Sequence, residues 1–323
     1  MTVADMEPDF LSQADPYRRE LLAHCYRMLG SVHDAEDLVQ ETMLRAWRAY
    51  DRFEGRSTLR TWLYRIATTV CLTALESRGK RPLPAGLGGP SEAGGQELEI
   101  REEVPWLEPL PSADDSVDST DPAAIVTARE STRLAFVAAL QHLPAKQRAV
   151  LILRDVLAWR AAEVAELLDT STAAVNSALQ RARAQLAEVA PTREDVVEPT
   201  DEEKQALLAR YVEAFERKDV EAIVALLAQD AVWEMPPFAT WFQGQEQVAR
   251  HLTLQCPGEP GDFRFVRTEA NGEPALAMYL RGEDGVFHPF TLQAFTVSGS
   301  TFSHVVSFFD HRLFETFGLP STR

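Results

Sequence analysis

The sequence has few cysteines and no long apolar run. Its three cysteines, Cys25, Cys71 and Cys256, are far apart along 323 residues and lack metal-ligand spacing, so neither a disulfide framework nor a zinc motif is expected. No apolar stretch is long enough to predict a transmembrane helix. The N-terminal residues MTVADMEPDF lack the basic segment and apolar core of a secretion signal. We therefore expect a cytoplasmic protein with reduced cysteines and no membrane contact.

Two further absences concern bound groups. No glycine-rich phosphate loop and no cluster of metal-ligating residues occurs in the sequence. We therefore expect no cofactor and no metal.

One segment also lacks acidic residues, although the chain as a whole is strongly acidic. The formal net charge is −17, yet no Asp or Glu occurs from Ser171 to Leu186. A surface that binds phosphates has to exclude carboxylates. This segment therefore favours a nucleic-acid-binding helix over the alternative, an ordinary hairpin with a solvated polar face.

The stretch from Leu143 to Leu186 has the pattern of a helix-turn-helix. A first helix is expected from Ala145 to about Leu157. The short second helix has an apolar side formed by Ala162, Val164, Ala165, Leu167 and Leu168. Ser171 and Thr172 are good N-caps for the third helix. Its apolar face has Val175, Leu179, Ala182 and Leu186 at helical spacing. Its opposite face can bond bases or phosphates through Asn176, Ser177, Gln180, Arg181 and Arg183.

The segments LPAKQRAVLILRDV and VNSALQRARAQL resemble region 4 of the extracytoplasmic-function branch of the sigma-70 family. The resemblance implies that this part of the chain reads the −35 promoter element and touches RNA polymerase. The residues that it implies for −35 contacts are Arg154, Thr172, Asn176, Ser177, Gln180, Arg181 and Arg183.

Residues 10–82 have the pattern of another helical domain. The first helix has one apolar face, formed by Leu21, Leu22, Cys25, Met28 and Leu29. Gly30 suits the left-handed position that ends such a helix. A second helix is expected to begin at His33 and Asp34, and a third to run from Leu59 to about Arg78. Trp62 is expected in the core, as the alternative to a DNA contact.

The segments DAEDLVQETMLRAW and TLRTWLYRIA resemble sigma region 2. The polymerase-binding residues implied are Asp34, Asp37, Gln40 and Glu41, for which the alternative is a solvated face. The residues implied for the −10 element are Phe53, Gly55, Arg56, Ser57, Arg60, Arg65, Thr69 and Thr73. Family members often have Asn and Asp where Thr69 and Thr73 stand, so the usual −10 preference is not carried over.

Residues 83–121 have the composition of a linker. A glycine-rich run, AGLGGPSEAGG, which cannot hold a helix or strand, precedes a mostly acidic stretch. This composition predicts a mostly extended or disordered connector. Trp106 and Leu107 lie between prolines and are interpreted as a docking motif, the alternative being an accident of a proline-rich loop. Sigma factors of this branch with an added C-terminal domain carry a similar WLPEP-type motif. Residues 122–190 follow as the second sigma domain, with a helix starting at Pro122.

Residues 200–323 contain helices first and strands afterwards. Thr200 and Glu203 form a capping box, and the strands expected are Ala231–Met235, PALAMYLRG, HPFTLQAFTVSG and TFSHVVSFFD. YVEAFERKDVEAIVALLAQDAVWEMPP and FQGQEQVARHL resemble the SnoaL-like branch of the nuclear transport factor 2-like fold, which implies an α+β cone with one pocket. The candidate pocket residues are Trp233, Met235, Trp241, Phe242, His288, Phe290 and His304.

No spacing among the candidate acid–base groups of this domain demands catalysis. These groups are Glu234, His251, His288, His304 and Asp310, and a lone His on a strand is usually a paired structural residue. We therefore predict a regulatory domain without catalytic residues. A buried acid–base pair inside an apolar pocket would count against this prediction.

The fold class expected is thus multidomain, with two all-α sigma domains, the second a helix-turn-helix, followed by the α+β SnoaL-like domain. The resemblance implies a sigma factor whose partners are core RNA polymerase and promoter DNA. The C-terminal domain is expected to dock on the sigma domains in place of a separate anti-sigma factor, and whether it binds a small molecule is left open. The alternatives are a helix-turn-helix repressor and a pocket enzyme with a vestigial DNA-binding module.

Overall fold

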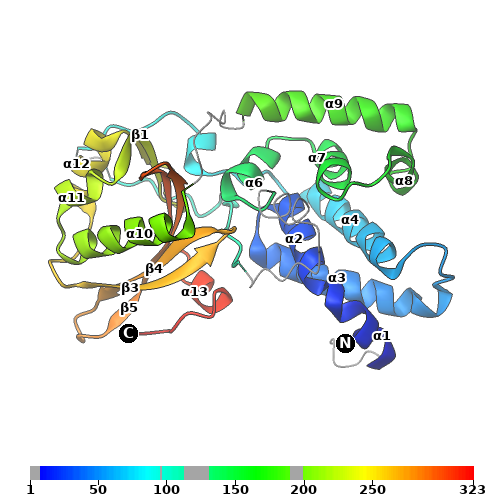
Figure 1. Ribbon diagram of the computed structural model, residues 1–323, viewed down its shortest axis with the longest axis horizontal. Coiled ribbons are helices and arrows are strands. Elements are labelled where there is room, and N and C mark those ends of the chain that lie inside the picture. Colours follow the sequence, from blue (N-terminus) through cyan, green and yellow to red (C-terminus); the bar gives the residue numbers. More distant parts are fainter. Residues whose placement is uncertain (1–7, 95–96, 113–130, 190–198) are drawn as a thin grey trace. The chain divides into compact units, whose positions relative to one another are not determined.

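The computed structural model describes residues 8–94, 97–112, 131–189 and 199–323, which form two compact units (Figure 1). The helical unit contains residues 8–81, 107–110 and 131–189 of the described chain. The C-terminal unit contains residues 82–94, 97–106, 111–112 and 199–323. The helix start expected at Pro122 lies outside the described residues. None of the described helices is long and apolar enough to cross a membrane.

The first part of the helical unit has the three helices expected from the sequence, preceded by a short one. These helices are α1 (Pro8–Ala14), α2 (Arg18–Leu29), α3 (Val32–Ala49) and α4 (Leu59–Ser77), with 3-10 turns at Asp15–Tyr17 and Tyr50–Arg52. Gly30 ends α2 in the predicted left-handed conformation, with φ of 72°. Ser31 caps α3, because its side chain accepts a hydrogen bond from the Asp34 amide.

One aromatic residue of α4, Trp62, does not occupy the place expected for it. Tyr64 is fully buried and its hydroxyl lies 3.2 Å from Glu20 Oε2. Trp62 is only half-buried and packs on Phe53, with ring centroids 4.9 Å apart. The expectation that Trp62 belongs to the core is therefore wrong, and the adjacent tyrosine fills that position.

The second part of the helical unit is the helix-turn-helix region. Its helices are α6 (Leu134–Leu140), α7 (Ala145–Leu151), α8 (Ala161–Leu167) and α9 (Thr172–Val189). The first expected helix differs from the prediction, because it continues past α7 as a π-helical turn, Ile152–Val156. Ala162, expected on the apolar side of α8, is exposed. Ser171 accepts a hydrogen bond from the Ala174 amide and caps α9 as predicted.

The C-terminal unit is built on a six-stranded mixed sheet in the order β2-β1-β6-β5-β4-β3. The strands are β1 (Leu227–Glu234), β2 (Trp241–Gln243), β3 (Phe263–Ala270), β4 (Glu273–Arg281), β5 (Phe287–Ser298) and β6 (Thr301–Phe308). The β1–β6 pair is parallel and the other pairs are antiparallel. The sequence did not predict β2 or β3.

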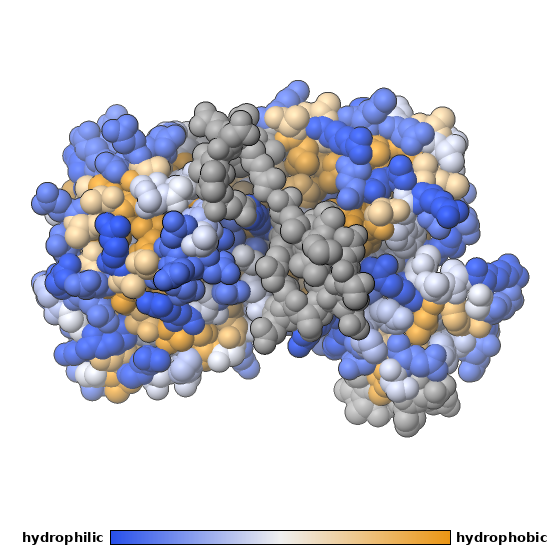
Figure 2. All heavy atoms as spheres, in the orientation of Figure 1, coloured by the Kyte–Doolittle hydropathy of each residue, from blue (hydrophilic) through white to orange (hydrophobic). Residues whose placement is uncertain are grey.

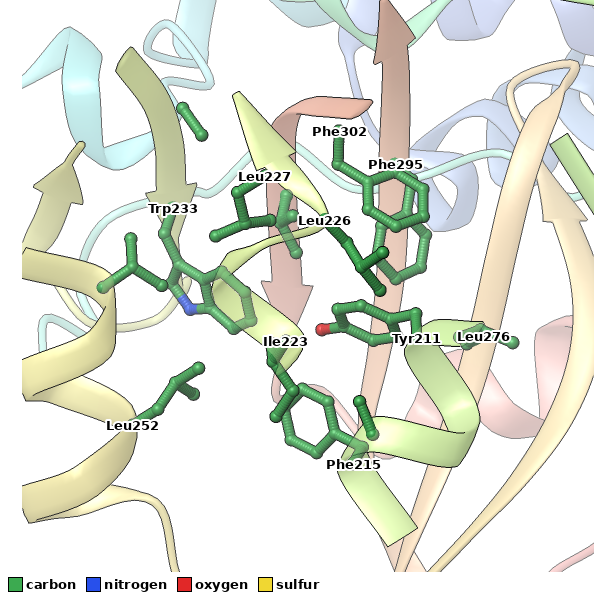
Figure 3. Packing of buried hydrophobic residues seen from close by; sticks show 14 of the residues in the cluster. Tyr211, Phe215, Ile223, Leu226, Leu227, Trp233, Leu252, Leu276, Phe295 and Phe302 are labelled. Carbon is green, nitrogen blue, oxygen red and sulfur yellow. The ribbon is translucent and has the colours of Figure 1, made fainter. Parts of the chain in front are cut away.

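Helices α10 (Asp201–Glu216), α11 (Val220–Val224) and α12 (Gln245–Gln255) accompany this sheet, and α13 (Arg312–Thr316) follows it. The predicted capping box of Thr200 and Glu203 is present at the start of α10. Figure 3 shows how Tyr211 and Phe215 of α10 lie among the apolar residues of the sheet. The Tyr211 ring is 5.0 Å from that of Phe295 and 5.5 Å from that of Phe302, so this helix closes the core over the strands.

The linker differs from the extended connector that its composition predicted. Residues 82–106, where described, belong to the C-terminal unit. The Ser91 amide donates to the Trp241 carbonyl at 2.8 Å, and the Arg101 amide donates to the Pro237 carbonyl at 2.9 Å. A 3-10 turn at Pro84–Gly86 lies where neither helix nor strand was expected. Composition missed this packing because the backbone, rather than the side chains, supplies these bonds.

A buried histidine of the helical unit makes stability depend on pH. His24 is fully buried, with Nε2 2.9 Å from Thr68 Oγ1, and burial, with a smaller contribution from Arg27, lowers its pKa to about 3. Below the unfolded value of 6.5 the unfolded chain binds a proton that the folded chain rejects. Stability is therefore full above that pH and falls as the pH drops, by at most about 1.4 kcal/mol per pH unit.

We predict that His24→Gln flattens this acid dependence. Urea unfolding between about pH 6.5 and pH 4 should show a smaller loss of unfolding free energy in the variant than in the wild type. The exposed His311 provides the control, because His311→Gln should keep the wild-type slope. Equal slopes in the wild type and His24→Gln would contradict the assignment to His24.

Candidate nucleic-acid interface and C-terminal cavity

The polar face of α9 is open. The predicted contact residues Thr172, Asn176, Ser177, Gln180, Arg181 and Arg183 are all exposed, whereas Val175, Leu179 and Ala182 are buried. In Figure 2, hydrophilic residues lie along this helix between paler apolar ones. The helix therefore presents amides, hydroxyls and guanidinium groups on one side, a set that can bond base edges and phosphates.

Four of the predicted −35 residues bond other groups within the helical unit. Arg181 donates to Ser177 Oγ at 3.1 Å on the exposed side of α9. Arg183 pairs with Asp155 through two hydrogen bonds, of 2.7 and 2.9 Å. Arg154 is half-buried and donates to the Trp159 carbonyl across the turn between the π-helical segment and α8. Arg154 thus braces the helix-turn-helix, while Arg183 keeps its guanidinium at the surface.

The predicted −10 residues form an exposed loop followed by one stripe of α4. Gly55 and Arg56 are exposed, and Phe53 and Ser57 are half-buried. Thr69 and Thr73 are exposed on α4, one turn apart, and each hydroxyl bonds the carbonyl four residues earlier.

Two arginines of this region are paired. Arg60 donates to Glu20 Oε2 at 2.6 Å, and Arg65 donates to Glu166 Oε1 of α8 at 2.9 Å. The Arg65 hydrogen bond lowers the pKa of the Glu166 carboxyl. The acidic side chain of one helical region therefore covers a basic side chain of the other.

The candidate polymerase face on α3 is largely exposed. Asp37 and Gln40 are exposed, and Glu41 bonds Arg45 at 2.6 Å on the same helix. Asp34 differs, because its carboxylate pairs with Arg78 at 2.9 Å and with Arg81. Three of the four predicted residues thus face solvent or a surface partner, and the fourth fixes the end of α4 to the start of α3.

The linker motif contacts the corner between α2 and α3. Leu107 is fully buried and Glu108 accepts hydrogen bonds from Ser31 Oγ at 2.6 Å and from His33 Nδ1 at 2.9 Å. The Glu108 amide donates to the Gly30 carbonyl at 3.0 Å. Trp106 is only half-buried, and its indole donates to the Arg101 carbonyl in the C-terminal unit. We call residues 107–110 the anchor.

Two buried arginines join the halves of the helical unit. Arg148 of α7 donates to the Met28 carbonyl of α2 and to Gln141 Oε1 at 2.7 Å. Arg27 donates to the Ser131 carbonyl at 3.3 Å. Burial lowers the pKa of each to about 10, so both stay charged at neutral pH. No spacing in the sequence signals these contacts, which sequence reasoning missed.

The C-terminal unit contains an apolar cavity of about 250 Å³. Three of the candidate pocket residues line it, namely Trp233, Met235 and Phe290. The other four do not. Trp241 donates to the Gly88 carbonyl, Phe242 lies behind His251 with ring centroids 4.6 Å apart, and His288 pairs with Asp284 at the surface. The fourth, His304, pairs with Glu234 outside the cavity.

His304 and Glu234 form an acid–base pair outside the cavity. His304 Nε2 is 2.6 Å from Glu234 Oε2, and the other carboxylate oxygen accepts from the Ala85 amide of the linker at 2.6 Å. Glu234 is buried and follows Trp233 on β1, so the two side chains lie on opposite faces of the strand. This pair was not predicted, because only the parallel register of β1 and β6 brings it together.

The cavity wall offers little acid–base chemistry. Its one histidine, His251, has Nδ1 2.8 Å from the Gln255 amide oxygen, and burial lowers the pKa of its imidazole. Burial raises the pKa of the Cys256 thiol to about 11, which keeps it protonated. The described residues contain no group of three or more side chains that could hold a metal ion.

Comparisons with known proteins agree with this arrangement. The profile of Sigma-70 region 2 matches residues 14–81, that of Sigma-70 region 4 matches residues 133–186, and that of the SnoaL-like domain matches residues 208–315. The ECF RNA polymerase sigma factor SigG of Mycobacterium tuberculosis is 57% identical over 316 residues, which cover 97% of this chain and 85% of SigG.

A second relative has a known structure. The ECF RNA polymerase sigma factor SigJ of Mycobacterium tuberculosis is 30% identical over 287 residues, 85% of this chain and 82% of SigJ. Its crystal structure superposes with a TM-score of 0.62 and 26% identity, covering 96% of this chain and all of that one. The chain therefore belongs to the extracytoplasmic-function sigma factors of the sigma-70 family, with a C-terminal SnoaL-like domain.

Proposed function

We propose that this sigma factor reads the −35 element with the exposed face of α9 and the −10 element with α4 and the loop of residues 53–57. The observation that carries the proposal is the exposed face of α9 between Thr172 and Leu186, which contains no Asp or Glu although the chain has a net charge of −17. The open acidic face of α3 supports binding to core RNA polymerase there. Because core RNA polymerase acts in the cytoplasm, we infer that this protein acts there too.

Arg181 provides the test of base reading. We predict that Arg181→Ala weakens discrimination between the preferred −35 sequence and a substituted one by about 1–3 kcal/mol. Run-off transcription with core polymerase on the two promoters measures it. Arg210→Ala, an exposed change of the same kind on α10, should leave discrimination unchanged. A uniform loss on both promoters would show that Arg181 contacts phosphate and not a base.

We further infer that the C-terminal domain regulates the helical unit through the linker. The linker residues before 107 bond the C-terminal unit, and the anchor bonds the helical unit at the α2–α3 corner. The anchor lies beside the candidate polymerase face, because Arg81 pairs with Asp34 and is 4.0 Å from Glu108. A change in how the C-terminal unit holds the linker can therefore affect α3. The effect passes along the chain to the anchor, and from the anchor through Arg81 to Asp34.

Deletion of residues 191–323 is predicted to change promoter activity, and Glu108→Gln to change it in the same direction. The point variant is needed because deletion also uncovers apolar linker residues such as Ala93, which is packed in the C-terminal core. Glu108→Gln removes the carboxylate charge from the hydrogen bonds of Ser31 and His33. A hydrogen bond to a charged group is worth about 1.5–3 kcal/mol, against about 0.5–1.5 kcal/mol for a neutral one. Run-off transcription with core polymerase is the measurement.

The exposed Glu103 supplies a matched control, because Glu103→Gln removes the same charge five residues earlier in the sequence and outside the anchor. It should behave as the wild type. Unchanged transcription after deletion would contradict regulation by this domain. An effect of deletion that Glu108→Gln does not share would contradict the anchor as its route.

The contacts between the two halves of the helical unit support a closed resting state. Glu166 of α8 holds Arg65, one of the residues proposed to contact the −10 element, and Arg148 holds the α2 terminus. DNA phosphates would have to replace Glu166 at Arg65. We infer that promoter binding requires this ion pair to open.

We predict that Glu166→Gln raises initiation by core polymerase, by at most about fivefold, because an exposed ion pair contributes little. Initial rates on a −10/−35 promoter measure the effect. Glu188→Gln, an exposed change near the end of α9, removes the same charge away from Arg65 and serves as control. A decrease with Glu166→Gln would indicate that the pair belongs to the active state instead.

We also infer that the C-terminal domain has no catalytic role. The cavity wall contains an imidazole bonded to an amide rather than to a carboxylate. The Glu234–His304 pair instead fixes the linker through Ala85. The membership of this chain in the sigma-factor family supports the same inference, because core RNA polymerase catalyses phosphodiester bond formation.

A further inference from the structure

The cavity of the C-terminal unit has an apolar, uncharged wall. It lies among α10, α12 and the sheet, with Phe215, Leu252, Met278 and Phe309 among its lining residues. No Asp, Glu, Lys or Arg is among the described residues that line it. An uncharged apolar molecule can enter such a site without the desolvation cost that a charged one would meet.

One donor in the wall has no partner. Trp233 is 2% exposed, and its indole Nε1 is buried without a hydrogen-bond partner among the described residues. In Figure 3 the nitrogen is on the edge of the ring toward Leu252, another residue of the cavity wall. A buried donor without a partner is unfavourable, so a ligand that places an acceptor beside it gains affinity.

The other polar groups of the wall are already paired. Gln293 accepts from the Tyr211 hydroxyl at 3.1 Å and donates to Ser307 Oγ at 3.0 Å, and Thr291 donates to the Phe308 carbonyl at 3.0 Å. His251 bonds Gln255. The unsatisfied indole therefore sets the requirement for a ligand with a hydrogen-bond acceptor such as a carbonyl oxygen.

The volume limits the size of the ligand. An apolar cavity of about 150 Å³ is large enough for benzene, and this one is about 250 Å³. By this comparison, a cavity of that volume accommodates a molecule of roughly two fused rings. Drug-sized molecules occupy pockets of about 300–1,000 Å³ and are too large.

The linker supplies part of the wall. Leu98 lines the cavity, and the backbone that follows it is bonded to the unit at residues 99 and 101. The Ala239 amide donates to the Glu99 carbonyl at 2.8 Å, and the Arg101 amide donates to the Pro237 carbonyl at 2.9 Å. A molecule in the cavity therefore packs against the same segment that leads to the anchor.

We propose that this cavity binds a small, uncharged, bicyclic molecule with a carbonyl acceptor for Trp233 Nε1, and that binding tightens the hold of the C-terminal unit on linker residues 98–101. The proposal rests on the regulatory role proposed above for the C-terminal domain. It makes the cavity a sensor whose occupancy is passed to the linker through Leu98.

The test compares 1-tetralone with tetralin, a pair that differs by the carbonyl group. The full chain, with its tryptophan side chains labelled with ¹⁵N, is titrated with each probe while the indole N–H signals are followed by NMR. Tetralone should shift the Trp233 signal downfield and bind roughly fivefold more tightly than tetralin. Absence of any shift of that signal at millimolar tetralone would overturn the proposal.

Trp233→Phe identifies the donor. The variant keeps an aromatic ring and loses the N–H, so the preference for tetralone over tetralin should disappear. Trp241→Phe is the matched control, because Trp241 donates to the Gly88 carbonyl and does not line the cavity, and the preference should persist. A preference that survives in Trp233→Phe would contradict the role of this donor. The wild-type comparison stands even where a variant folds poorly.

Hydrogen exchange tests whether binding in the cavity tightens the hold on linker residues 98–101. Tetralone should slow exchange of the Arg101 and Ala239 amides by several-fold, and amides of the helical unit remote from the anchor, such as that of Thr61 in α4, should not change. Binding without slower exchange at these two amides would overturn the coupling. These readouts involve no transcription, so a failure here is distinguishable from a failure of the regulatory role.

Discussion

The helical unit depends on the absence of a side chain at residue 30. Gly30 turns the chain between α2 and α3 with φ of 72°, and a Cβ there would lie 2.8 Å from Leu107 Cδ1 and 3.0 Å from the Gln141 side chain. Gln141 in turn accepts a hydrogen bond from Arg148. Arg148 also donates to the carbonyl of Met28, two residues before Gly30. One backbone position therefore joins region 2, the anchor and region 4. Any larger residue would separate three segments that are distant in sequence.

Much of the fold could be predicted because it is locally encoded. Helix caps at Ser171 and Thr200, the left-handed Gly30 and the polar face of α9 depend on residues within a turn of one another. The features that sequence reasoning missed depend on distant partners. The Glu234–His304 pair needs the parallel register of β1 and β6. Strand β2 has only three residues, too few to show the alternation by which a strand is predicted. The linker was misread because its composition describes side chains, whereas its backbone makes the bonds.

The two units use charge in different ways. In the helical unit, buried arginines are held by carbonyl and amide oxygens, and the Glu166–Arg65 pair lies at the surface, where water and salt weaken it. In the C-terminal unit, a buried carboxylate fixes the linker while the cavity wall stays uncharged. The first arrangement suits contacts that open for DNA, and the second suits a permanent attachment beside a site for a neutral molecule. The regulation that we propose through the linker draws on both.

The linker belongs to a unit that is completed only at the far end of the chain. The linker leaves the ribosome long before the strands that it bonds, since Ala85 bonds β1, Ser91 bonds β2, and both strands lie beyond residue 226. The segments of the helical unit, by contrast, are all made by residue 190. At about 5–20 residues per second, the remaining chain takes on the order of ten seconds to appear. During that interval each new molecule has the whole sequence of the helical unit and only part of the C-terminal unit. Under the regulation that we propose, every copy therefore begins without control by the C-terminal unit.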